Sequence, residues 1–360
     1  MPVDFGLDFF PDMRPNEKSG AEYYAEALRI VQAGEELGST RVKTVEHYFH
    51  PYGGYSPDPA VFLSACAALT KRQRLMTGAV LPAFSHPLKL AGQLAMLDCI
   101  SGGRLDAGIA RAFLPHEFAA FGVPMDESRG RFEEGIDALQ QLWTRDEVTF
   151  HGKYWNFERV SSLPKPVQQP HPPIWIAAIA TPASFQWAGE HGYAMMVVPY
   201  LADFDELADH LALYRESFRR SGAAGQPRVM MVMHCVIDPE RAAARERAWS
   251  AMQHYIGVFR DIASWWEGRT EAQYAHYDDL PRLLDTMTWD RVDRENRAIV
   301  GDPAAAVDKT QRLLDTFGEC DLSLQVHFGG ITAEQAIDSL RLFAEQVNPR
   351  VGVPAAASAG

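Results

Sequence analysis

Short apolar runs alternate with helical segments eight times along this chain, and this alternation restricts the possible folds more than any other feature. The run at 174–180 is apolar throughout, which is typical of a parallel strand covered on both faces. Helical periodicity follows each run, as in 21–37, where Gly38 stands at the expected helix end. The expected strands cover residues 3–9, 42–45, 75–81, 104–110, 174–180, 194–198, 228–237 and 321–328. Repeated strand–helix units predict an α/β fold of the (β/α)8, or TIM-barrel, class.

Two segments interrupt the alternation. Residues 145–173 contain a hairpin pattern around Gly152 followed by five prolines, and residues 259–297 are irregular and rich in Trp, Tyr and Asp. We therefore expect one barrel domain over 1–350, with insertions after helix four and between helix seven and strand eight. The small residues at 351–360 are expected to form a flexible tail. An open doubly wound sheet is the alternative, but neither G-x-G-x-x-G nor G-x-x-x-x-G-K-[ST] occurs.

Composition argues against several classes of function. The chain has 34 Lys and Arg against 47 Asp and Glu, a net charge of −13, so general affinity for nucleic-acid phosphate is not expected. The N-terminus lacks a signal-peptide pattern, and no apolar stretch is long enough to cross a membrane. Four cysteines lie far apart without a C-x-x-C, which favours a reduced, cytoplasmic location; they are Cys66, Cys99, Cys235 and Cys320.

The expected strand ends carry few ionisable groups. In a (β/α)8 barrel, catalytic groups lie at the C-terminal ends of the strands. Here the one cluster is Glu46, His47 and His50, which offers too few ligands for a metal ion, so no metal site is expected. Lys43 lies mid-strand, which disfavours a Schiff-base lysine. Small and apolar strand ends with one arginine suit a flat, phosphorylated cofactor.

Three stretches are candidates for binding and proton transfer. Arg111 follows a strand of small residues and could grip a phosphate, or alternatively pair with a neighbouring acid. Thr181 and Ser184 lie at a helix start, where free N–H groups bind anions, although an ordinary helix cap is an equal alternative. His47 could transfer a proton or could be a structural histidine. Glu46 is expected to fix the tautomer of His47 or to pair with an arginine.

Several motifs, taken in order, resemble the bacterial-luciferase-like flavin monooxygenases nearly from end to end. The set is specific, although each motif alone is weak. The motifs are VEHYF at 45–49, TGAVLPAFSHP at 77–87, SGGRLDAGIARAFLPHEFAAFG at 101–122, SRGRFEEG at 128–135, VGDPAAAVDKTQ at 300–311 and HFGGI…SLRLFAEQVNPRV at 327–351.

The resemblance implies a (β/α)8 barrel, often a homodimer, that uses reduced FMN from a separate flavin reductase. With O2 it would insert one oxygen atom into an organic substrate through a C4a-(hydro)peroxyflavin. It further implies that His47 is the catalytic histidine and that Gly78-Ala79 is a non-proline cis peptide under the flavin ring. Residues 259–297 overlap the mobile active-site loop of the family. The implied phosphate contacts are Arg111, the backbone of Phe113, Ala180 and Thr181, and Ser184.

The chain departs from the luciferase pattern at three positions. Tyr48 replaces a second histidine, Ala110 replaces a reactive cysteine, and Ala180 replaces an acidic residue. These departures favour oxygenation of a substrate other than a long-chain aldehyde and disfavour light emission. Two alternatives remain open. One is an F420-dependent oxidoreductase of the same superfamily, which the EHYF motif disfavours. The other is a non-catalytic flavin-binding subunit, which His47 and Arg111 disfavour.

Overall fold

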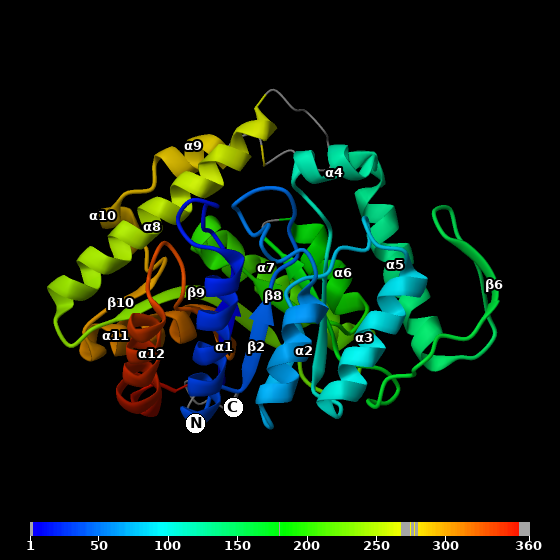
Figure 1. Ribbon diagram of the computed structural model, residues 1–360, viewed down its shortest axis with the longest axis horizontal. Coiled ribbons are helices and arrows are strands. Elements are labelled where there is room, and N and C mark those ends of the chain that lie inside the picture. The colour runs from blue at the N-terminus through cyan, green and yellow to red at the C-terminus, as the bar shows by residue number, and fades with distance from the viewer. Residues whose placement is uncertain (1–2, 180, 268–273, 275–276, 278–279, 353–360) are drawn as a thin grey trace.

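Eight parallel strands close into a barrel, as the sequence predicts (Figure 1). The computed structural model describes residues 3–352 except 180, 268–273, 275–276 and 278–279. Closure is complete because β8 pairs with β9 and β11 pairs with β1. The barrel strands are β1 (Phe5–Phe9), β2 (Arg41–Thr44), β3 (Arg74–Thr77), β4 (Leu105–Ala110), β7 (Ile174–Ala178), β8 (Ala194–Val197), β9 (Val229–Ile237) and β11 (Asp321–Gln325).

Helices surround the barrel, and several of them begin at polar capping residues (Figure 1). Ser19 and Thr332 each form a capping box, and Asp58 and Asp203 accept bonds from the first-turn N–H groups of their helices. The large helices are α1 (Gly20–Glu36), α2 (Pro59–Leu69), α3 (Pro87–Ser101), α5 (Ser128–Thr144), α6 (Pro182–Glu190), α7 (Phe204–Ser221), α8 (Arg241–Ala263), α11 (Pro303–Phe317) and α12 (Ala333–Leu342). Within the described part of the chain, none of the helices combines the length and apolarity needed to span a membrane.

The first insertion is the expected hairpin, formed by β5 (Val148–His151) and β6 (Asn156–Val160), which pair antiparallel and project from one side of the barrel (Figure 1). The described part of the second segment, 259–297, is more regular than expected. Helix α8 continues to Ala263, and α9 (Leu280–Asp285) and α10 (Trp289–Arg294) follow before β10 (Ile299–Gly301), which pairs with β9. Leu284 and Val292 anchor these two short helices in the core. The many Trp and Asp residues in this segment hid the helical pattern in the sequence.

A short helix, α4 (Pro115–Phe121), was not predicted. It starts with a proline in its first turn and ends at Gly122, which has a positive φ of 66°. Short single helical turns also occur, at Met125–Glu127, Pro199–Leu201, Ser264–Trp266, Phe343–Val347 and Asn348–Arg350.

Residues 351–360 were expected to form a flexible tail, and the structure describes the first two of them. Residues 353–360 lie outside the described residues. Val351 is buried, and Gly352 forms hydrogen bonds in both directions with the Gln311 side chain. Of the first two residues of the expected tail, Val351 therefore packs in the core and Gly352 is attached to α11.

Charged side chains fill the barrel at the N-terminal ends of its strands. Asp106 is fully buried and accepts hydrogen bonds from Arg41 Nε at 3.0 Å and from Arg74 Nη2 at 2.7 Å. Arg41 also reaches Asp321 at 3.1 Å, and its guanidinium lies 5.1 Å from the ring centroid of Trp175. This network fills the barrel at the N-terminal ends of the strands, so a ligand site is expected at their C-terminal ends.

Candidate functional site

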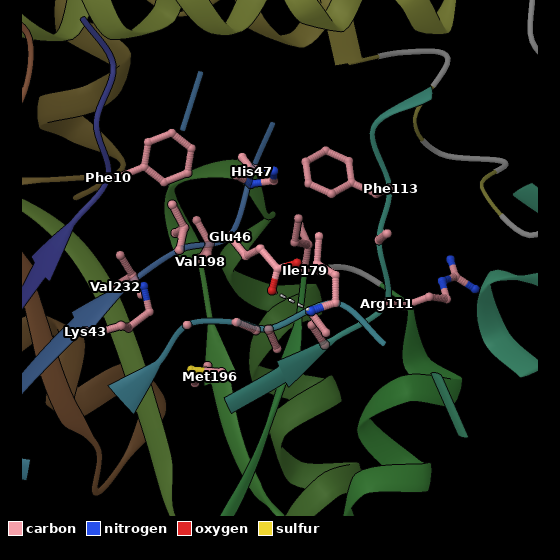
Figure 2. A pocket seen from close by; sticks show the side chains of 18 of the residues that line it. Phe10, Lys43, Glu46, His47, Arg111, Phe113, Ile179, Met196, Val198 and Val232 are labelled. Carbon is pink, nitrogen blue, oxygen red and sulfur yellow. Dashed lines mark hydrogen bonds between the residues drawn. The ribbon is translucent and has the colours of Figure 1, made fainter. Parts of the chain in front are cut away.

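A pocket lies at the C-terminal ends of the barrel strands (Figure 2). Its empty volume is ≈1120 Å³, including the part open to solvent, which is ample for a cofactor. Seven of the eight predicted site residues line it: His47, Gly78, Ala79, Arg111, Phe113, Thr181 and Ser184. Ala180 lies outside the described residues. The expected cis peptide between Gly78 and Ala79 is present.

His47 follows β2 and is held by a carboxylate from α4. Its Nδ1 lies 3.0 Å from Oε1 of Glu117, a residue that is fully buried and also accepts the Tyr48 N–H at 2.9 Å. The carboxylate favours a proton on Nδ1, which leaves Nε2 as the nitrogen that can take or give one. Gly53, with φ of 78°, packs so closely that a Cβ there would meet the His47 ring at 2.6 Å. The imidazole is therefore fixed in orientation.

Glu46 does not orient His47, so that prediction was wrong. The backbone turns after β2, so Glu46 faces away and accepts the Tyr48 hydroxyl at 2.5 Å and the Leu81 N–H at 3.1 Å. The second of these bonds is drawn as a dashed line in Figure 2. Burial raises the pKa of Glu46 to about 8. At neutral pH this carboxyl is therefore protonated.

The Glu46→Gln variant should lose less stability than the wild-type protein as the pH rises. The folded state favours protonated Glu46, so its contribution is complete below the ordinary pKa of 4.5 and is lost as the pH rises toward 8. As the pH rises from 4.5 to 8, the free energy of unfolding of the variant should increase relative to that of the wild-type protein by up to about 5 kcal/mol. Urea unfolding at pH 5 and pH 8.5 measures the difference. Parallel stability curves for the two proteins would contradict a raised pKa.

One side of the pocket carries groups suited to an anion. Arg111 follows β4, and its guanidinium lies 4.3 Å from the ring centroid of Tyr274. Thr181 precedes α6, where its side chain makes no capping bond, and Ser184 lies in the first turn of that helix. The start of α6 and the arginine thus line the same pocket, as the sequence predicts.

Aromatic rings surround His47. The centroids of Phe10 and Tyr52 each lie 5.6 Å from that of the imidazole, and the ring of Phe113 approaches edge-on at 5.9 Å. Tyr277 extends this wall, 5.4 Å from Phe113. Figure 2 shows Phe10 and Phe113 on either side of His47. The part of the pocket next to the imidazole is therefore mainly apolar.

Comparison with known proteins identifies the family. A family model described as luciferase-like monooxygenase matches residues 3–319. The chain belongs to the luciferase-like monooxygenase family. It is 31% identical over 259 residues, 71% of each chain, to the oxygenase component of the flavin-dependent trigonelline monooxygenase of Acinetobacter baylyi.

Two solved structures resemble this luciferase-like chain over nearly its whole length. The crystal structure of monooxygenase RslO1 from Streptomyces bottropensis is 40% identical, with a TM-score of 0.87 and coverage of 96% of this chain and 99% of that one. The oxygenating constituent of 3,6-diketocamphane monooxygenase from Pseudomonas putida, in complex with FMN, is 19% identical with a TM-score of 0.81, covering 99% and 100%. At that identity the second likeness shows a shared fold.

The luciferase-like pocket fits a phosphorylated flavin. Arg111 and the start of α6 line one side, where they would suit the phosphate, and aromatic and aliphatic side chains would form walls for a ring system. Deeper in the pocket, the buried Nε2 of Gln325 has no hydrogen-bond partner among the described residues. A polar ligand edge would satisfy it.

Sequence reasoning missed several residues of this luciferase-like site. Glu117 is the most important, and the helix signals Pro115 and Gly122 would have placed it on a short helix just after the fourth strand. Phe10 and Tyr52 lie in loops without a recognisable pattern. Lys43 was set aside as a mid-strand residue, yet it lines the pocket because the barrel interior is open at that level.

Proposed function

We propose that this protein is the oxygenase of a two-component, FMN-dependent monooxygenase that inserts one atom of O2 into an organic substrate. The proposal is carried by one observation: an imidazole fixed by a buried carboxylate borders an apolar pocket that has an anion site at one side. The flavin dependence of the trigonelline relative supports the cofactor. A separate flavin reductase would supply reduced FMN.

Different residues of the pocket would bind the cofactor, exclude water and transfer a proton. Reduced FMN, when bound, supplies the electrons that activate O2. Arg111, Ser184 and the N–H groups at the start of α6 hold the phosphate. Phe10, Tyr52 and Phe113 exclude water from the reacting region. His47 gives or takes a proton at Nε2, while Glu117 keeps the Nδ1 proton in place.

Rapid mixing tests this function. Reduced FMN bound to the protein is mixed with oxygenated buffer, and the return of oxidised-flavin absorbance is followed. The apolar surroundings of the bound flavin should slow that return relative to free flavin. Equal rates with and without the protein would overturn the proposal. Substrate turnover by the purified chain with a reductase would exclude a purely non-catalytic flavin-binding subunit.

Replacing Arg111 with alanine should raise the Kd for FMN by about 10–100-fold, since a charge-assisted hydrogen bond contributes roughly 1.5–3 kcal/mol. The Kd of the Arg111→Lys variant should lie between those of the wild-type protein and the alanine variant, because lysine keeps the charge but lacks the two parallel N–H donors of the guanidinium. Fluorescence titration measures both variants. Riboflavin, which lacks the phosphate, is the control ligand, and its Kd should change little. An equal loss for riboflavin would contradict a phosphate contact.

Competition between cofactors addresses the F420 alternative. Equilibrium binding of FMN and F420 to the same protein shows which one the pocket prefers. The short anion site made by Arg111 and α6 favours FMN, whose phosphate is its terminal group. Tighter binding of F420 would shift the function to hydride transfer without oxygen.

We also propose a homodimer formed through α2 and α3, which lie side by side (Figure 1). Four large apolar side chains on these helices are exposed: Val61 by 70%, Leu69 by 42%, Met96 by 53% and Ile100 by 50%. Apolar groups concentrated on one helix pair are typical of an interface.

The Met96→Glu/Ile100→Glu double variant is expected to halve the mass measured by analytical ultracentrifugation, because it places two charges in that interface. Leu163→Glu, at an exposed site in the hairpin insertion, should leave the mass unchanged. A wild-type protein that sediments as a monomer would contradict the dimer. The cytoplasmic location expected from the cysteines stays a prediction.

A further inference from the structure

A second cavity, lined by residues of β9, α8 and α9, lies next to the main pocket that contains His47. Its empty volume is ≈310 Å³, including the part open to solvent. Tyr200 lines both spaces, so they are adjacent. We call this second space the His234 cavity, after the residue of β9 that lines it. Its apolar lining consists of Met252, Ile256, Phe259, Leu284 and Met287. A lining of this kind suits a mainly apolar ligand.

His234 is a polar group of this cavity that the protein leaves without a partner. Its side chain is only 1% exposed, and neither ring nitrogen has a hydrogen-bond partner among the described residues. Burial lowers the pKa of His234 to about 3, so the imidazole is neutral at physiological pH and offers one N–H donor and one acceptor. Buried polar groups are normally hydrogen-bonded, so this ring is suited to bond to a molecule that enters the cavity.

The other polar groups of the His234 cavity pair within the protein. The hydroxyls of Tyr200 and Tyr255 lie 2.7 Å apart. Arg297 donates to the backbone carbonyls of Tyr200 and Ala202, at 2.7 and 3.0 Å. Its Nε also lies 2.6 Å from Oε2 of Glu295. The charge of the guanidinium is thus balanced by a carboxylate of the chain, and the cavity suits an uncharged ligand.

Aromatic side chains lie between the His234 cavity and the imidazole of His47. Tyr52 lines the main pocket with its ring centroid 5.6 Å from that of His47, and it stacks on Phe259 of the cavity at 4.3 Å. The Tyr255 hydroxyl donates to the Tyr52 hydroxyl at 3.4 Å, a long and weak hydrogen bond. Since Tyr200 lines both spaces, a ligand that displaces its ring would reach from one into the other.

We propose that the His234 cavity is a substrate subsite, which binds an uncharged aromatic group that carries one hydroxyl or carbonyl oxygen. The oxygen hydrogen-bonds to His234, and the ring packs against the aromatic side chains of Tyr200, Tyr255 and Phe259. Two methionines in the lining adapt to the outline of the ligand. This inference rests on the proposed function, because the same substrate has its oxidised atom near His47. It assigns to the oxygenase a largely apolar substrate with such a group at the end remote from that atom.

Phenol and toluene test the subsite, since they are similar in size and differ in the hydroxyl. Isothermal titration calorimetry of the full chain without flavin gives the Kd for each probe. In His234→Leu the Kd for phenol should rise about three- to tenfold through one lost hydrogen bond, while the Kd for toluene should change by less than about twofold. Met287→Trp fills the cavity with a larger side chain and should raise both Kd values by about tenfold or more.

Gln73→Leu is the matched control. Gln73 is also fully buried, and neither polar atom of its side chain has a partner among the described residues. It precedes β3, at the N-terminal ends of the strands, and lies outside the cavity, so its replacement should leave the Kd for phenol unchanged. His234→Leu should keep or increase the free energy of unfolding measured in urea, because no protein group loses a hydrogen-bond partner. If that variant does not fold, Met287→Trp still tests the cavity.

The outcomes separate this inference from the proposed function. Phenol that shows no saturable binding, or that binds the wild-type protein and both cavity variants equally, would overturn the inference alone. A phenol affinity that falls equally in Gln73→Leu and His234→Leu would do the same. If the two probes behave as expected but bound reduced FMN is oxidised as fast as free flavin, the proposed function fails and the substrate role fails with it.

Discussion

Replacing His47 with alanine is expected to lower substrate oxygenation by about 10²–10⁴-fold, the usual contribution of a positioned general acid or base. Among the described residues that line the pocket, His47 is the one histidine, and its ring is fixed in orientation by Glu117 on one nitrogen and by Gly53 against its face. Steady-state kinetics with a supplied reductase measure the loss. The Kd for FMN should change by less than threefold, because the anion site is untouched.

Glu117→Gln separates orientation from proton transfer. The amide keeps the shape of the side chain but can present an N–H to His47 Nδ1, which would reverse the tautomer and place the proton on Nε2. We expect an intermediate loss of activity together with a changed pH profile. Glu117→Asp should recover part of the activity. If Glu117→Gln lowered activity without any change in the pH profile, Glu117 would be structural only.

Replacing Asp106 with alanine is expected to destabilise the protein by about 3–5 kcal/mol, the cost of removing one partner from a buried ion pair. Asp106 is fully buried and pairs with both Arg41 and Arg74, so its loss leaves Arg41 buried with Asp321 as its remaining ionic partner among the described residues. Urea unfolding followed by circular dichroism measures the change.

Asp338→Ala is the matched control for this prediction. Asp338 pairs with Arg341 on α12, but both side chains are about half exposed or more, at 68% and 49%. Exposed pairs of this kind contribute roughly 0–1 kcal/mol. A comparable loss in the two variants would show that the network at the lower end of the barrel contributes no more than a surface pair.

The luciferase-like barrel could be predicted from the sequence because its signals are local. Apolar runs such as 174–180, helix caps such as Ser19 and Thr332, and helix-ending glycines each depend on residues a few positions apart. The positions of His47, Arg111 and Ser184 followed from the same alternation, because parallel strands bring their C-terminal ends to one edge.

The partners of the site residues were decided by the tertiary structure. Glu117 is 70 positions from His47, and Asp8 and Gln325 are joined to Lys43 only through strand register and barrel closure. Sequence placed Glu46 beside His47 and therefore chose the wrong carboxylate, since neighbours in a chain leaving a strand point in different directions. Local periodicity determines which elements form, whereas the closure of the barrel determines which polar groups are buried together and so which of them must pair or bind a ligand.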